Sequence, residues 1–73
     1  MEVIKGATYK HFKGHIIKVI EIAVHTETEE LMVVYSHNGT IWVRPYDMFV
    51  SKVDKEKYPY VEQKYRFQLV NEE

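Results

Sequence analysis

Short apolar segments alternate with polar turns along the chain, the pattern of a β-rich fold. The first segment, residues 7–12, is aromatic and β-branched, so we expect a strand there. The pair Lys13-Gly14 that follows suits a tight turn, because glycine readily adopts a positive φ. A second strand is expected over residues 16–24.

The apolar run over residues 16–24 has little polar interruption, which predicts a curved strand covered on both faces. Strict alternation within it would send Ile22 to the face opposite Ile17 and Val19. A β-bulge near Glu21 would bring all three side chains to one face, because a bulge adds one residue to one strand of a pair.

The middle of the chain predicts a β-hairpin. Residues 25–30 are polar and rich in Thr and Glu, which suits a turn, and residues 31–35 resume as an apolar strand. The Asn-Gly pair at 38–39 tolerates the positive φ angles of a type I′ turn. Residues 41–44 form the return strand, which Pro45 ends because proline has no N–H to donate to a neighbouring strand.

The last third of the chain predicts one helical turn and further strands. We expect a helical or 3₁₀ turn over residues 45–49, a short strand over 50–53 and a charged, solvated turn over 54–57. Residues 61–70 alternate aromatic and apolar positions, which favours one more strand and leaves a short helix as the alternative. Five or six short strands with one helical turn predict an all-β fold, a small SH3-like barrel.

Length and composition restrict the possible functions. Seventy-three residues fit a single domain over residues 1–73, and a 45% hydrophobic, 29% charged composition is that of a globular chain. A net charge of −1 means that any nucleic-acid role must rest on a local patch. Cysteine is absent, and the N-terminus and the longest apolar run, residues 31–35, suit neither a signal peptide nor a membrane span. We therefore expect a cytoplasmic protein with no membrane association.

Four motifs occur in an order and spacing typical of one family. They are Tyr-Lys-His-Phe-Lys-Gly at 9–14, Ala-Val-His-Thr-Glu-Thr at 23–28, Val-Val-Tyr at 33–35 and Ile-Trp-Val-Arg-Pro-Tyr-Asp-Met-Phe at 41–49. Over residues 6–53 the chain resembles a widespread family of small bacterial proteins known as domain of unknown function 1653. The resemblance implies an SH3-like barrel and no established activity.

The chain departs from the family pattern mainly in its loops. Ile17 stands where the family usually has Tyr, the turn at residues 36–40 is shorter, and residues 55–63 look like an insertion. Residues 54–73 are expected to supply this insertion and a closing C-terminal strand. That strand covers a sheet edge of its own chain, or alternatively pairs with the same strand of a second copy.

Trp42 and Arg44 form the first candidate recognition surface. Side chains two residues apart on a strand point the same way, and Trp and Arg are enriched at binding hot spots. The alternative is that Trp42 belongs to the core and that Arg44 forms an ion pair with Asp47.

Tyr9, His11 and Lys13 share a second strand face, with Tyr35 and Tyr46 as candidate neighbours. Interleaved aromatic and basic groups can stack bases or hold an anionic or peptide ligand. The alternative is that the basic residues of 1–18 and the acidic residues of 21–30 form ordinary exposed ion pairs across the sheet.

A metal site is a further candidate. His25 and Glu27 would point the same way on a strand, and with His11 and His37 they could hold a metal ion. A hydrolase would use His11, His25 and Glu27. The alternative is that this polar segment caps a turn, with His25 half exposed. Neither serine lies in a nucleophile elbow and the glycines form no phosphate loop, so enzyme activity is not expected.

We therefore interpret the chain as a binding module for a protein segment or an anionic ligand such as RNA, acting without a cofactor as a monomer or homodimer. The metal-dependent hydrolase and a structural homo-oligomer are the alternatives. The candidate ligand-binding residues are Tyr9, His11, Lys13, His25, Glu27, Tyr35, Trp42 and Arg44.

Overall fold

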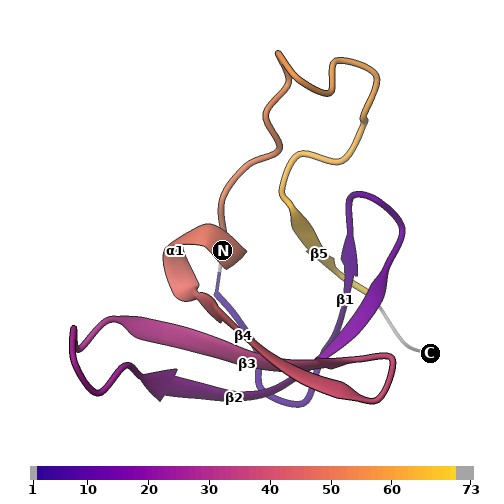
Figure 1. The fold of residues 1–73 in the computed structure, drawn as a ribbon. Helices are drawn as coiled ribbons and strands as arrows, with labels where there is room; N and C mark the ends of the chain where they lie inside the picture. The colour runs from indigo at the N-terminus through magenta and orange to yellow at the C-terminus, as the bar shows by residue number, and fades with distance from the viewer. Residues whose placement is uncertain (1, 71–73) are drawn as a thin grey trace.

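The computed structural model describes residues 2–70, and the predicted domain's outermost residues, 1 and 71–73, lie outside this part. Within it, five strands form one antiparallel sheet in the order β4-β3-β2-β1-β5 (Figure 1). The elements are β1 (Thr8–His11), β2 (Ile16–Val24), β3 (Leu31–His37), β4 (Thr40–Pro45), α1 (Tyr46–Phe49) and β5 (Phe67–Leu69). The sheet is strongly bent, and its order, with a helical turn between the fourth and fifth strands, confirms the predicted all-β, SH3-like barrel. In residues 2–70, no helix is long and apolar enough to cross a bilayer.

Strand β2 has the predicted bounds and the predicted bulge. Its register against β3 shifts between Val19 and Glu21. As a result Ile17 and Val19 are buried, and Ile22 packs against the same core. The bulge therefore explains how Ile17, Val19 and Ile22 all face the core although side chains alternate along a strand.

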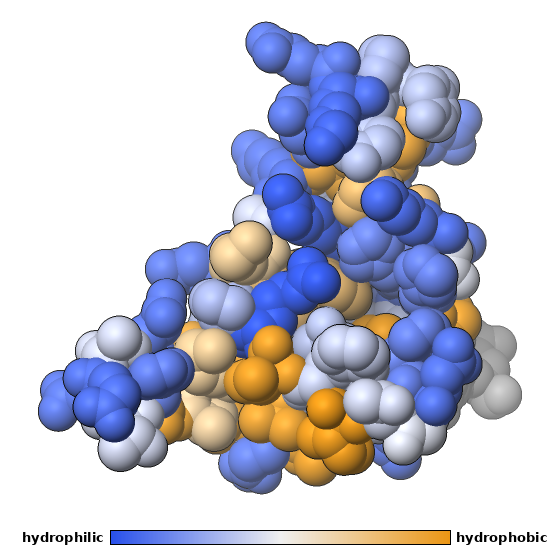
Figure 2. All heavy atoms as spheres, viewed as in Figure 1, coloured by the Kyte–Doolittle hydropathy of each residue, from blue (hydrophilic) through white to orange (hydrophobic). Residues whose placement is uncertain are grey.

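The prediction that β2 is covered on both faces is wrong. Ile16 and Val24 are 54% and 60% exposed, and Ile20 is also exposed. Residues 2–70 form one sheet and a four-residue helix, so no second layer within them covers the outer face. Figure 2 shows hydrophobic residues gathered over the lower part of the molecule, where β4 runs, with hydrophilic side chains over the C-terminal loop above.

The predicted hairpin between β3 and β4 is confirmed. Asn38 and Gly39 have φ angles of 50° and 76°, as a type I′ turn requires. Strand β3 continues past residue 35 because Ser36 and His37 pair with the first residues of β4.

The C-terminal third contains less regular structure than predicted. The strand expected over residues 50–53 is reduced to one isolated bridge between Lys52 and Tyr65. The strand expected over 61–70 shortens to β5, which pairs with β1 of the same chain, and no helix forms there. Hydrogen bonds within the loop between Lys52 and Tyr65 hold its two arms together. The Lys55 ammonium donates to the backbone carbonyls of Val61 and Gln63.

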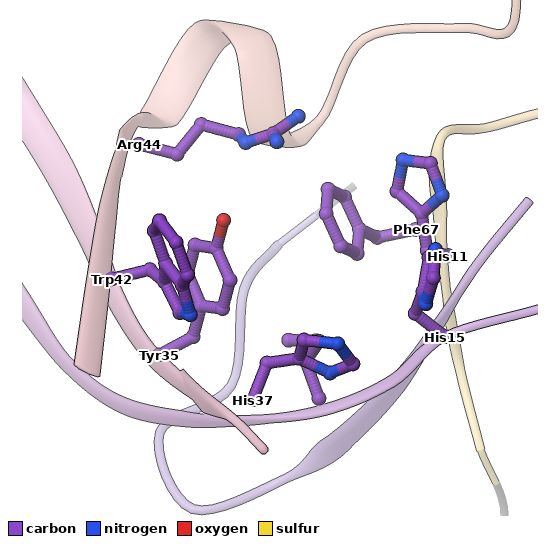
Figure 3. Close-up of a pocket in the computed structure, with 8 residues that line it drawn as sticks. His11, His15, Tyr35, His37, Trp42, Arg44 and Phe67 are labelled. Atoms are coloured by element: carbon purple, nitrogen blue, oxygen red, sulfur yellow. The ribbon is translucent and has the colours of Figure 1, made fainter. Parts of the chain in front are cut away.

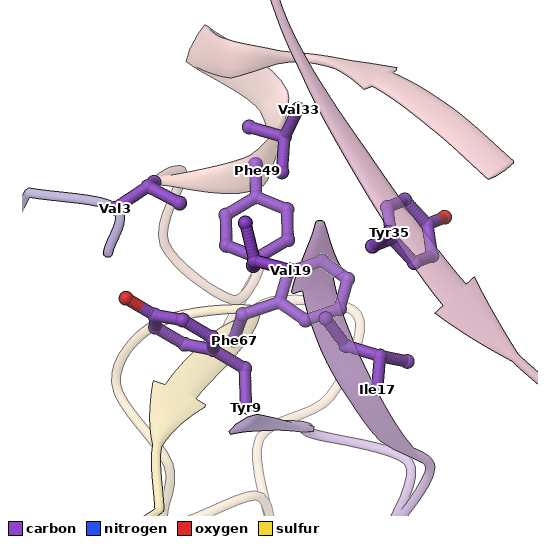
Figure 4. Close-up of a cluster of buried hydrophobic side chains, with 8 residues drawn as sticks. All are labelled: Val3, Tyr9, Ile17, Val19, Val33, Tyr35, Phe49 and Phe67. Atoms are coloured by element: carbon purple, nitrogen blue, oxygen red, sulfur yellow. The ribbon is translucent and has the colours of Figure 1, made fainter. Parts of the chain in front are cut away.

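The core lies inside the curve of the sheet, where α1 and β5 meet it. Its buried members, drawn in Figure 4, are Val3, Tyr9, Ile17, Val19, Val33, Tyr35, Phe49 and Phe67. The Phe49 and Phe67 rings stack at 4.1 Å, and Tyr9 meets Phe49 edge-on at 5.4 Å. Each such fully buried side chain contributes about 1.5–3 kcal/mol of burial free energy. These contacts fix β5 and α1 beside each other.

Candidate ligand-binding site

A pocket of about 250 Å³ opens on the inner face of the sheet, between β4 and β5. These strands are the two ends of the sheet order and do not pair with each other. Figure 3 shows Tyr35 and Trp42 on one side, Phe67, His11 and His15 across from them, Arg44 above and His37 below. We call this the aromatic pocket; its lining is completed by Ile17, and its histidines are His11, His15 and His37.

Strand register explains why Trp42 and Arg44 line the aromatic pocket. Trp42 pairs with Tyr35 and Arg44 pairs with Val33. Paired residues point to the same face of a sheet, so both side chains lie on the inner face with Tyr35 and Val33. Trp42 is 50% exposed and is not a core residue. The Arg44 guanidinium lies 5.3 Å from the centre of the Phe67 ring, and the alternative pairing with Asp47 is not formed.

The sequence interpretation missed His15, and it considered His37 only as a possible metal ligand. The His15 ring lies 5.8 Å from that of His11 and 5.1 Å from that of His37. The signal was present, because each residue adjoins a hairpin turn containing glycine, and the pairing of β2 with β3 brings those two turns to the same end of the sheet. Among residues 2–70, however, no three His, Asp or Glu side chains are grouped to hold a metal ion.

His11 lies where the aromatic pocket meets a second pocket. Its pKa is lowered from 6.5 to about 4, mainly by burial and then by the positive charges of Arg44, His15, Lys13 and Arg66. Its Nδ1 accepts the backbone N–H of Lys13 at 3.1 Å. The ring is therefore neutral at pH 7, with its proton on Nε2.

The second pocket, of about 340 Å³, shares His11 and Arg44 with the first. We call it the basic pocket, because its charged residues are four cations and one carboxylate: Lys13, Arg44, Lys57, Arg66 and Asp54. Phe12 and Tyr58 complete its lining. Together, the two pockets form one groove.

The cations of the basic pocket are not neutralised within the described part of the chain, where the one ion pair joins Lys5 to Glu21. The Asp54 carboxylate forms no ion pair with these cations; it accepts hydrogen bonds from the backbone N–H groups of residues 56 and 57. The Nε of Arg66 is buried without a hydrogen-bond partner. Lys13 instead lies 5.6 Å from the centre of the Tyr58 ring. The groove therefore presents positive charge beside aromatic rings.

Three of the predicted site residues lie elsewhere. Tyr9 is only 1% exposed, and its hydroxyl accepts the Ile4 N–H at 2.9 Å, so it is a core residue that cannot contact a surface ligand. The His25 Nδ1 accepts the N–H groups of Glu27 and Thr28, so this segment caps a turn. The metal site at His11, His25 and Glu27 is not assembled, because strand β2 separates His25 from the groove. His11, Lys13, Tyr35, Trp42 and Arg44 do line the groove.

Comparison with known proteins identifies one family. Residues 7–69 match the model of a family described as Protein of unknown function (DUF1653). The match extends past residue 53, through the C-terminal loop and β5. No curated protein and no solved structure matches the chain significantly.

Proposed function

This chain belongs to the DUF1653 family of proteins of unknown function, and we propose that it is a binding module for an anionic ligand. The ligand is held in the groove made by the aromatic and basic pockets. The observation that carries this proposal is the set of four cations, opposed by one carboxylate, beside a half-exposed tryptophan. We propose the cytoplasm as its site of action, in keeping with a chain that has no cysteine.

Charge distribution supports an anion over a neutral partner. The whole chain carries a net charge of −1, so the basic pocket is a local exception to a slightly acidic molecule. Cations that lack internal partners repel each other, and an anion among them relieves this repulsion. Arg44 and Arg66 are suited to oxyanions, because a guanidinium donates in a planar fork.

The test is a titration of the ¹⁵N-labelled protein with tripolyphosphate at constant ionic strength, followed by ¹⁵N–¹H correlation spectra. We expect saturable shifts centred on Lys13, Arg44, Lys57 and Arg66. The double variant Lys13→Gln/Lys57→Gln should bind at least about tenfold more weakly, because two phosphate-facing charges are lost. The control is Lys5→Gln, whose lysine pairs with Glu21 outside the groove.

Two results would contradict anion binding at the groove. One is a spectrum that tripolyphosphate does not change. The other is a set of shifts that the double variant and Lys5→Gln alter equally. Saturable binding of a neutral peptide to the same residues, without an effect of tripolyphosphate, would instead favour a protein segment as the ligand.

A further inference from the structure

We propose that the groove holds a nucleotide unit of a single-stranded nucleic acid, with the base in the aromatic pocket and the phosphate in the basic pocket. This inference rests on the proposed anion-binding function and specifies its ligand. It draws on the shape of the aromatic pocket, on the polar hydroxyl in its wall and on the wall that the two pockets share.

The aromatic pocket suits one flat ring system. At about 250 Å³ it is smaller than the roughly 300–1,000 Å³ of pockets for drug-sized ligands. Trp42 faces His11 across the opening (Figure 3), so a ring placed between them has an aromatic side chain on each side. Phe67 is only 2% exposed, with Phe49 stacked on its ring and Arg44 over it, so it forms part of the pocket wall. A base stacked on such side chains binds largely independently of its identity.

A polar group in the pocket favours a base over an apolar peptide side chain. Tyr35 directs its hydroxyl into the pocket on the side of Arg44 (Figure 3), and no residue of the described chain forms a hydrogen bond with it. A leucine or phenylalanine side chain would leave this hydroxyl unpaired, whereas the edge of a nucleobase carries acceptors for it.

The shared wall of the two pockets matches the way a nucleotide is built. His11 and Arg44 line both pockets, so an anion in one lies next to a ring in the other. In a nucleotide a single sugar joins the base to the phosphate, so the two groups are likewise neighbours. A paired base could not reach between Trp42 and His11, because stacking on protein rings requires an unpaired base. The ligand is therefore single-stranded.

The test compares a nucleotide with its separate nucleoside and sugar-phosphate parts. Binding is followed by ¹⁵N–¹H spectra and by the fluorescence of Trp42, which is the single tryptophan. The probes are uridine, ribose 5-phosphate, UMP, hexauridylate RNA and hexathymidylate DNA. We expect uridine to shift the aromatic pocket alone and ribose 5-phosphate the basic pocket alone. UMP should shift both pockets and bind more tightly than either part. Comparing UMP with the two hexamers distinguishes a free nucleotide from a polymer and RNA from DNA.

Substitutions separate stacking from charge. Trp42→Ala should lower the affinity for UMP at least about fivefold and leave ribose 5-phosphate unaffected, while Trp42→Phe should retain most of the affinity. Ile41→Ala is the matched control, because Ile41 precedes Trp42 on the opposite face of β4 and is exposed. The correlation spectrum of each variant shows whether it is folded.

The outcomes distinguish this inference from the proposed function. If UMP and ribose 5-phosphate bind equally, and Trp42→Ala affects neither, the nucleotide inference is wrong and anion binding stands. If hexaglutamate binds as tightly as hexauridylate, the ligand is an acidic peptide and the inference is again wrong. If neither tripolyphosphate nor any of the five probes binds, both proposals fail.

Discussion

His11 is the residue whose chemistry is most altered by its place in the groove. Its pKa is about 4 in the folded protein against 6.5 for an ordinary histidine. Between these values the unfolded chain binds a proton that the folded chain excludes, so stability is fully present above pH 6.5 and falls as the pH drops toward 4. We expect the His11 ring signals to titrate near pH 4, and tripolyphosphate to move this midpoint upward.

Urea unfolding at pH 7 and pH 4.5 measures the linked stability. His11→Asn should lose less stability over this interval than the wild type, because the proton-binding ring is gone while the amide oxygen can still accept the Lys13 N–H. His25→Asn makes the same change at a turn outside the groove. A His11 midpoint near 6.5 in the folded protein would contradict this prediction.

Glu29 offers a test of backbone strain at a single residue. Its φ of 61° lies in the left-handed region, which L side chains rarely adopt. Glu29→Gly should therefore stabilise the protein by about 0.5–1 kcal/mol, measured by urea unfolding. Glu30→Gly, at a neighbouring exposed position without a positive φ, should not stabilise it. Equal effects of the two substitutions would mean that the strain is not at Glu29.

Strand β5 depends on one side chain for its attachment. Phe67 stacks on Phe49, touches the edge of His11 and lies under Arg44, although β5 has only three residues. Phe67→Ala should cost about 3–5 kcal/mol and Phe67→Leu less, as measured by denaturant unfolding. Leu69→Ala is the control on the same strand, since Leu69 is 40% exposed and should cost much less. Equal losses at the two positions would contradict a dominant role for Phe67.

Predictions from sequence succeeded for elements defined by neighbouring residues. The Asn38-Gly39 turn and the bulge before Glu21 follow from local φ preferences and from alternation within one strand. The strand over residues 50–53 failed because a strand requires a distant partner along its length, and here the pairing is confined to one bridge, between Lys52 and Tyr65.

The candidate site could be predicted only in part. Alternation correctly grouped Trp42 with Arg44, but it also grouped Tyr9 with His11. Tyr9 and His11 lie on the same face of β1, but Tyr9 is buried in the core and His11 lines the groove. Alternation predicts which face a side chain is on and not how deeply it is buried. The juxtaposition of His15 and His37 depends on how two hairpins pair, which the periodicity of neither hairpin reveals.

At the scale of the whole molecule, the charge of the groove predicts a response of stability to anions. A ligand that binds only the folded state stabilises it by about 2.7 kcal/mol at 100 times its dissociation constant. Tripolyphosphate should therefore raise the melting temperature of the wild type more than sodium chloride of equal ionic strength does. The increase should be much smaller in Lys13→Gln/Lys57→Gln and unchanged in Lys5→Gln. Equal increases in all three proteins would mean that the anion acts outside the groove.

The unpaired ends of the sheet give the groove a mechanical role. Strands β4 and β5 face each other across the aromatic pocket without backbone hydrogen bonds between them. A ligand in contact with both would act as a cross-link between the two ends of the sheet and oppose their separation. Amide hydrogens along β4 and β5 would then exchange with solvent more slowly, including those of residues that never touch the ligand. Occupancy of the groove would thus set how often the barrel opens.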